Sequence, residues 1–181
     1  ENLTDSLTRS GTIGLDMVTR NLNFLTGLTG VTPDGSLVIP DSMSLKMKME
    51  MNGPQYKAKL DLKEGKGSMN VNAALNSSTE VYTADLKIND LQLHHFLPKD
   101  SIYELSLSAD AKGRGLDVMS FHSLANLNLS LDQLHYARYH LSNVHLTGNL
   151  KGALATAQLT SDNELLKMTA DAEYNLAHSY P

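Results

Sequence analysis

The chain has 181 residues, a formal net charge of −5 at pH 7, 41% apolar residues and no cysteine. This length is enough for one domain or a few stacked repeat units, and the apolar content predicts a folded chain. The acidic balance argues against a nucleic-acid partner, and the lack of cysteine excludes disulfides, thiol chemistry and cysteine-based zinc sites. Because Glu1 is not an initiator and no signal peptide or long apolar run is present, we interpret the chain as an interior piece of a longer protein.

Residues 1–35 differ from the rest and are expected to form a helical or linker segment. Asp16 could cap a helix there, and Gly27 or Gly30 could end it. The helix prediction depends on four apolar residues at helical spacing, namely Leu15, Val18, Leu22 and Leu25. Such a helix would cover an open end of a sheet, since exposed edges need protection.

Residues 36–181 change to a period of two, which is typical of antiparallel β-strands with one apolar and one wet face. Apolar residues at 45, 47, 49 and 51, for example, alternate with Lys46, Lys48 and Glu50, and Asn52-Gly53-Pro54 then predicts a turn. The alternation breaks at residues 93–98, where we expect a short helical turn or a wide loop. The fold class is therefore predicted to be all-β and mostly antiparallel.

The apolar face of these strands is too large to remain in water and must be covered by a second sheet, a helix or a ligand. Two architectures remain open, a dry β-sandwich and a single sheet curled into a trough, and the pattern alone favours the sandwich. In the trough, this face would form a groove whose candidate lining residues are Leu45, Met47, Met49, Met51, Tyr56, Leu60, Leu62, Met69, Val71, Leu86, Ile88, Leu105, Leu107, Leu127, Leu129, Leu131, Met168 and Tyr174.

The polar residues do not form the patterns that catalysis or metal binding needs. The seven histidines lack the repeated short spacing of zinc ligands, and the acidic residues are scattered singly on wet strand positions. There is no Gly-x-Ser-x-Gly motif, and Gly65-Lys66-Gly67 and Gly113-Arg114-Gly115 each lie between two strands, as hairpin turns do. We predict no catalytic residue, no metal site and no cofactor, and we predict that the protein is not an enzyme.

Three segments carry a family resemblance: GVTPDGSLVIPD at 30–41, DLKINDLQLHHFLPKD at 85–100 and LSLSADAKGRG at 105–115. Together with the strand-rich remainder, they resemble the TamB branch of the AsmA-like envelope proteins. The resemblance implies a curled, elongated sheet with a continuous apolar groove, a β-taco. It also implies a long protein that is anchored in the inner membrane and extends through the periplasm. The family is linked to phospholipid movement toward the outer membrane and, with a β-barrel partner, to outer-membrane protein assembly through other parts of the full-length protein.

Three functional hypotheses follow. The first is a groove segment that carries phospholipid acyl chains, whose walls should be aliphatic and adaptable, as leucine and methionine are. The second is a chaperone-like edge strand that pairs with a client strand by β-augmentation. The third is a dry structural spacer.

Overall fold

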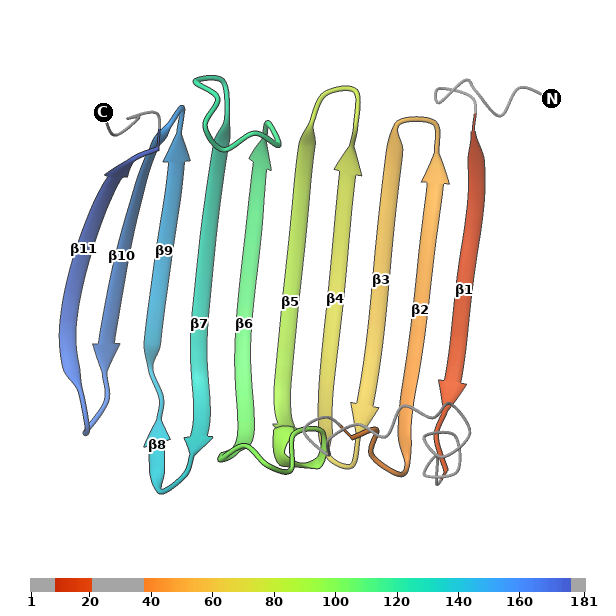
Figure 1. The fold of residues 1–181 in the computed structure, drawn as a ribbon, viewed down its shortest axis with the longest axis vertical. Helices are drawn as coiled ribbons and strands as arrows, with labels where there is room; N and C mark the ends of the chain where they lie inside the picture. Colours follow the sequence, from red (N-terminus) through yellow and green to blue (C-terminus); the bar gives the residue numbers. More distant parts are fainter. Residues whose placement is uncertain (1–8, 21–37, 177–181) are drawn as a thin grey trace.

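The structure is a computed structural model that describes residues 9–20 and 38–176, and these residues form one antiparallel sheet of eleven strands (Figure 1). The strands follow one another across the sheet in chain order, except that the short β8 pairs only with β7. Their bounds are β1 Ser10–Val18, β2 Met43–Asn52, β3 Gln55–Glu64, β4 Gly67–Asn76, β5 Val81–Gln92, β6 Ile102–Arg114, β7 Leu124–Tyr136, β8 Tyr139–Leu141, β9 Val144–Lys151, β10 Leu154–Asp162 and β11 Lys167–Asn175.

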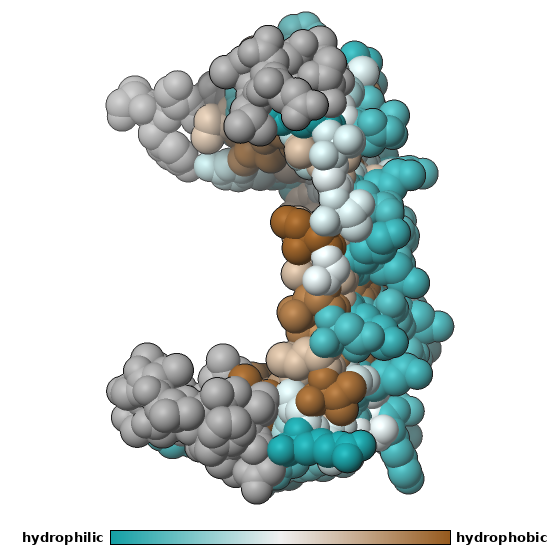
Figure 2. Space-filling model, turned by 90° about the vertical axis from the view of Figure 1, so that its right-hand side faces the viewer, coloured by the Kyte–Doolittle hydropathy of each residue, from teal (hydrophilic) through white to brown (hydrophobic). Residues whose placement is uncertain are grey.

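The all-β, antiparallel prediction is confirmed, but the sandwich alternative is not. The described residues form one sheet, which does not close on itself, and they include no second sheet that packs on it. The sheet is curved, and Figure 2 shows it along the β1 edge as a C with apolar side chains on its concave side and polar side chains on its convex side. A curved open sheet keeps one apolar face accessible, which a sandwich would not.

The N-terminal helix prediction was wrong where it can be compared with the structure. Residues 10–18 form β1, which pairs with β2 along its whole length, and Asp16 forms an ion pair with Lys46 (3.2 Å) instead of capping a helix. The spacing of Leu15 and Val18 fits a helix, but Ile13, Leu15 and Met17 also alternate with polar or small residues, and pairing with β2 decides for the strand. The other expected helical positions, Leu22 and Leu25, lie outside the described residues.

Short turns hold the strands in register. Gly53 and Gly65 adopt φ of 55° in the β2–β3 and β3–β4 turns, a conformation that glycine reaches without strain. Asn76 shapes the β4–β5 turn because its side-chain oxygen accepts hydrogen bonds from the backbone N–H groups of Ser78 (3.0 Å) and Thr79 (3.1 Å). Tight connections of this kind make sequence neighbours into sheet neighbours.

The predicted break at 93–98 is a 3₁₀ turn, η1 (Leu93–His95), that follows a bulge in β5. At the bulge Asp90 has φ 46°, and Ser106 on β6 accepts a hydrogen bond from the Asp90 N–H (2.8 Å) and donates one to its carboxylate (3.1 Å). Bulges bend a strand and redirect the chain. The chain therefore leaves the sheet in a defined direction at the end of β5.

The best-packed region lies at the end of the sheet where β1 ends, hereafter the lower end; the opposite end is the upper end. Met43, Leu62, Ile88 and Leu91 are buried there as one cluster, and Leu93 and Phe96 pack against them. Most other apolar side chains on the strands are only half-buried or exposed. The sheet thus has a small core at one end rather than a continuous interior.

Candidate functional site

The concave side of the sheet is a continuous surface of apolar side chains, hereafter the concave apolar face. The antiparallel register places apolar residues of successive strands opposite one another, so they form rows that run across the strands. One such row contains Leu15, Met47, Leu60, Val71, Leu86, Ala109, Leu129, Leu146, Leu159 and Ala170. The row nearer the upper end contains Ile13, Met49, Ala58, Ala73, Ala84, Ala111, Leu127, Gly148, Ala157 and Ala172.

Seventeen of the eighteen candidate residues from the sequence fall in these rows or in the rows next to them, and Leu105 lies on the same face one row further toward the lower end. Leu62 and Ile88 are buried, whereas Met49, Tyr56, Leu127 and Tyr174 are exposed. The other twelve are half-buried: Leu45, Met47, Met51, Leu60, Met69, Val71, Leu86, Leu105, Leu107, Leu129, Leu131 and Met168. The structure therefore brings them together on one surface, on which only Leu62 and Ile88 are buried.

Several members of this face were not among the residues predicted from the sequence. The β1 residues Ile13, Leu15 and Met17 were assigned to a helix or overlooked, although their alternation marks a strand. Leu146 on β9 and Leu159 on β10 lie in the same row as Leu129 but were not among the candidate residues. The rows also contain alanines. Alternation within a single strand does not show whether an alanine contributes to the apolar face.

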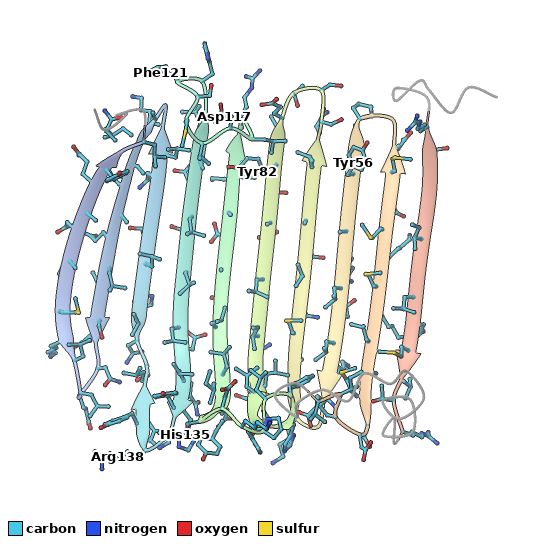
Figure 3. All side chains as sticks on the ribbon, viewed as in Figure 1. Tyr56, Tyr82, Asp117, Phe121, His135 and Arg138 are labelled. Carbon is cyan, nitrogen blue, oxygen red and sulfur yellow. The ribbon has the colours of Figure 1, made fainter. Side chains whose placement is uncertain are left out.

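The upper end of the concave apolar face contains a hollow of about 590 Å³ over β1 to β5, hereafter the upper hollow. Alanines from three strands, Ala58, Ala73 and Ala84, contribute to its lining, and the larger Tyr56 and Tyr82 lie beside them (Figure 3). Small side chains between large ones leave a depression. Its volume is within the range of small-molecule sites, about 300–1,000 Å³.

The connection between β6 and β7, residues 115–123, borders the upper hollow through Leu116. Asp117 fixes this connection, since its side chain accepts a hydrogen bond from the Met119 N–H (2.9 Å) and its carbonyl accepts one from the Ser123 hydroxyl (2.5 Å). Phe121 is nevertheless 78% exposed, and Val118 and Met119 are also exposed (Figure 3). Ordered backbone therefore presents apolar side chains beside the hollow.

The lower end of the concave apolar face is covered by the chain itself. The turn at 93–98 packs on the buried cluster through Leu93 and Phe96, and the Phe96 carbonyl accepts a hydrogen bond from the Val38 N–H (2.7 Å). His95 is hydrogen-bonded through Nδ1 to Glu64 Oε1 (2.7 Å). The Glu64 side chain is only 6% exposed, and its Oε2 has no hydrogen-bond partner within residues 9–20 and 38–176. A buried carboxylate with one unsatisfied oxygen makes this contact costly to break or to leave half-formed.

The convex face is polar and carries ion pairs between neighbouring strands or along one strand. The Asn70 amide donates a hydrogen bond to Asp61 (2.7 Å), and this bond, aided by Lys59, holds the pKa of Asp61 below its ordinary value. A hydrogen bond and the positive charge from Lys48 likewise lower the pKa of Glu50. These charges lie on the wet side of the sheet, so the concave apolar face has no such network among its strand residues.

The described residues show no arrangement with an evident catalytic or metal-binding geometry. No three histidine or acidic side chains among them converge as metal ligands. His94, Tyr103, His135 and His140 instead form a chain of ring contacts, with centroids 4.1 to 5.6 Å apart from one ring to the next. What the described part of the chain offers chemically is an apolar surface.

Comparisons with known proteins return no matching family model, curated protein or solved structure. In the described ranges, no helix has the length and apolar character needed to cross a bilayer. The concave apolar face and the sequence resemblance are therefore the two observations that bear on function.

Proposed function

We propose that this chain is a segment of a lipid-transport protein whose concave apolar face holds the acyl chains of phospholipids. The observation that carries the proposal is the accessible apolar face of an open, curved sheet, on which the central residues Leu45, Leu60, Leu107 and Leu129 are half-buried and none is enclosed. Such a face is unstable in water, and lipid tails would cover it without needing a specific polar contact.

The free energy of binding an acyl tail suits a protein that transfers lipid better than one that stores it. Burying about fifteen methylenes of one tail removes roughly 12 kcal/mol of unfavourable hydration, at about 0.8 kcal/mol for each methylene. A tail in a bilayer is already buried to the same extent, so the difference between membrane and groove is small. A groove with aliphatic walls can therefore accept and release tails without one strong site.

The rows of apolar residues give the groove a direction. They run across the strands, and ten strands at about 4.8 Å spacing make a path of roughly 43 Å. One leaflet of a bilayer core of about 30 Å is only about 15 Å deep, which is the span of a single tail. The sheet is therefore long enough for more than one tail along its axis.

The wider setting of this proposal follows from the TamB-like sequence resemblance. It supports a β-taco groove in a periplasm-spanning protein that is anchored in the inner membrane. The cargo would be phospholipid moving between the inner and outer membranes. A contribution to outer-membrane protein assembly, with a β-barrel partner contacted by other parts of the protein, belongs to the same proposal.

The test is to purify the chain, extract it with organic solvent and identify bound lipid by mass spectrometry. We expect co-purified phospholipid, and we expect Met49→Asp or Leu129→Asp to reduce it severalfold, because a charge in the groove must be desolvated when a tail binds. Asn72→Asp, a new charge on the convex face, is the matched control and should leave lipid recovery unchanged. Equal lipid recovery from all variants would contradict the proposal.

A chaperone-like role is a second candidate, favoured by the free edges of β1 and β11 in the described sheet. It predicts crosslinks from residues 168–176 to an unfolded outer-membrane protein, rather than crosslinks from the groove. A purely structural spacer would require protein to cover the concave apolar face, and the described residues cover only its lower end.

A further inference from the structure

The floor of the upper hollow is a single row of small side chains, hereafter the alanine floor. Its members, Ala58, Ala73 and Ala84, lie directly opposite one another on β3, β4 and β5. The rows on either side carry larger side chains: Tyr56, Leu75 and Tyr82 toward the upper end, and Leu60, Val71 and Leu86 toward the lower end. Neighbouring rows on one face are about 7 Å apart. The alanine floor is therefore narrow, and its width suits one extended hydrocarbon chain.

The length of the alanine floor matches one acyl tail. Three strands at about 4.8 Å spacing give it a length of roughly 14 Å along the groove. A tail that fills one leaflet of a bilayer spans about 15 Å. Beyond β3 the next residue in the row is Met49, whose unbranched side chain adapts to its neighbours. The occupant that these dimensions fit is one tail that lies along the groove and crosses the strands.

The described lining of the upper hollow is apolar on the concave side, apart from the phenol groups of Tyr56 and Tyr82. The other polar lining residues alternate with the apolar ones along their strands, so their side chains belong to the convex face. They are Thr12, Glu50, Lys57 and Thr83. A ligand held by charge would find no partner among these concave side chains, whereas a hydrocarbon chain needs none.

Tyr82 forms the wall of the upper hollow on the β6 side. It lies opposite Gly113 on β6, and its ring extends over this glycine, so that a Cβ there would collide with the phenol oxygen. Figure 3 shows Tyr82 at the upper end, next to the connection that carries Asp117. Leu116 of that connection also borders the hollow, and its N–H donates a hydrogen bond to the Glu80 carboxylate (3.3 Å). The wall is therefore built from two connected parts of the fold.

The row of the alanine floor continues behind this wall for one strand. Ala111 on β6 lies opposite Ala84, and Leu127 on β7 comes next in the row. Ala111 is as small as the three floor alanines, yet it does not border the upper hollow. The position of Tyr82, and not the size of the floor residues, thus separates Ala111 from the hollow.

We propose that the upper hollow binds one acyl tail along the groove and that Tyr82 determines the longest tail that fits. This inference rests on the proposed function, because it requires tails to bind on the concave apolar face. It adds a position for the tail, an orientation and a residue that sets a length limit. Each of these can fail while lipid still binds elsewhere on the face.

Straight-chain fatty acids presented in phosphatidylcholine vesicles test the length limit. The purified chain is mixed with vesicles that contain equal amounts of acids of different lengths, and the bound acids are quantified by native mass spectrometry. We expect equal recovery up to about fifteen methylenes, because each of them exchanges one apolar environment for another. Recovery should then fall by up to about fourfold for each further methylene, which leaves the bilayer for water.

The wall is tested by Tyr82→Ala, which should raise the limit by about four or five methylenes, the width of one strand. Adding Ala111→Leu to this variant should restore the wild-type limit, since the leucine refills the space behind the wall. Tyr56→Ala is the matched control, because this tyrosine stands beside the alanine floor and not at its end. A limit that is unchanged in Tyr82→Ala, or one that moves as far in Tyr56→Ala, would overturn the proposal.

The position of the site is tested by Ala73→Leu and Ala111→Leu, which add the same side chain in one row. Only Ala73 borders the upper hollow. We expect Ala73→Leu to lower the recovery of every acid at least about fivefold and Ala111→Leu to lower it less than about twofold. Circular dichroism would show that both variants fold.

Equal losses in these two variants would overturn the proposal. The proposed function would still stand if Leu129→Asp lowers the recovery of co-purified phospholipid. A wild-type chain that binds no fatty acid of any length would also overturn the proposal, and it would count against the proposed function only if phospholipid is absent from the purified chain as well.

Discussion

The lower and upper ends of the concave apolar face have the same strand pattern but differ in what covers them. At the lower end Leu91 is 4% exposed, beneath the turn that carries Leu93 and Phe96. At the upper end Met49 is 46% exposed and borders the upper hollow. The difference arises from a connection between strands, not from the strands.

This contrast shows that the alternation of apolar and polar residues determines which face of the sheet is apolar, but not which segment packs over that face. A two-residue turn, such as Gly53-Pro54, cannot reach over the sheet, whereas the segment from the β5 bulge to β6 can. The His95–Glu64 contact then ties that segment to β3. Stability is expected to be concentrated at the covered end and ligand access at the open one.

The strongest test of this contrast is a pair of truncations, one at each end. Leu91→Ala should lower the free energy of unfolding by about 2–5 kcal/mol, because a buried leucine leaves a cavity. Met49→Ala should lower it by less than about 1 kcal/mol, because its side chain is partly in water already. Urea denaturation monitored by circular dichroism measures both. Equal losses would show that the two ends are packed alike.

A smaller effect is expected from the contact that holds the covering turn. His95→Ala removes the one hydrogen-bond partner that the buried Glu64 carboxylate has among the described residues and should destabilise the protein by about 1–3 kcal/mol. His94→Ala is the control, since His94 contacts only the Tyr103 carbonyl by hydrogen bond (3.3 Å) in the described structure. A double-mutant cycle with Glu64→Gln isolates the pair. A coupling energy near zero would contradict the assignment.

The smallest effect is expected on the opposite face of the same end. Asn70→Ala should raise the pKa of Asp61 toward its ordinary value of 3.8, because the Asn70 hydrogen bond is the main cause of the lowering. A lowered carboxyl pKa stabilises the fold above the ordinary value, and this contribution is lost as the pH falls through the folded-state pKa. The variant should therefore match the wild type more closely in acid than at pH 7. NMR titration of the Asp61 carboxyl measures the shift, and an unchanged titration would refute it.

Much of the fold could be predicted from the sequence because apolar and polar residues alternate within each strand. The structure has turns at two predicted positions, Asn52-Gly53-Pro54 and Glu64-Gly65-Lys66-Gly67. It also has the predicted break in the strands at 93–98. The strand at 10–18 was mistaken for a helix because Leu15 and Val18 have helical spacing, although Ile13, Leu15 and Met17 in the same short stretch have the spacing of a strand. Only its partner, β2, distinguishes them, and pairing is not a local property.

The sequence predicted which residues share the concave apolar face, but it did not predict the shape of that face. Every candidate residue lies on the concave side because side chains two apart in a strand share a face. The upper hollow could not be predicted, since it arises where Ala58, Ala73 and Ala84 from three strands become neighbours. The Glu64–His95 contact joins residues 31 positions apart, and it exists only because the β5 bulge redirects the chain.

The strictly sequential pairing of the sheet has a consequence for how such a chain can change in length. Tracing the register from β2 through β3 and β4 places Met51 and Tyr82 in the same row. Removing residues 55–76, which form the β3–β4 hairpin, would bring β2 beside β5 as an antiparallel neighbour with that row intact. The sheet would shorten by about 10 Å. Gain or loss of whole hairpins can therefore adjust the span of the molecule in fixed steps, without repacking of an interior.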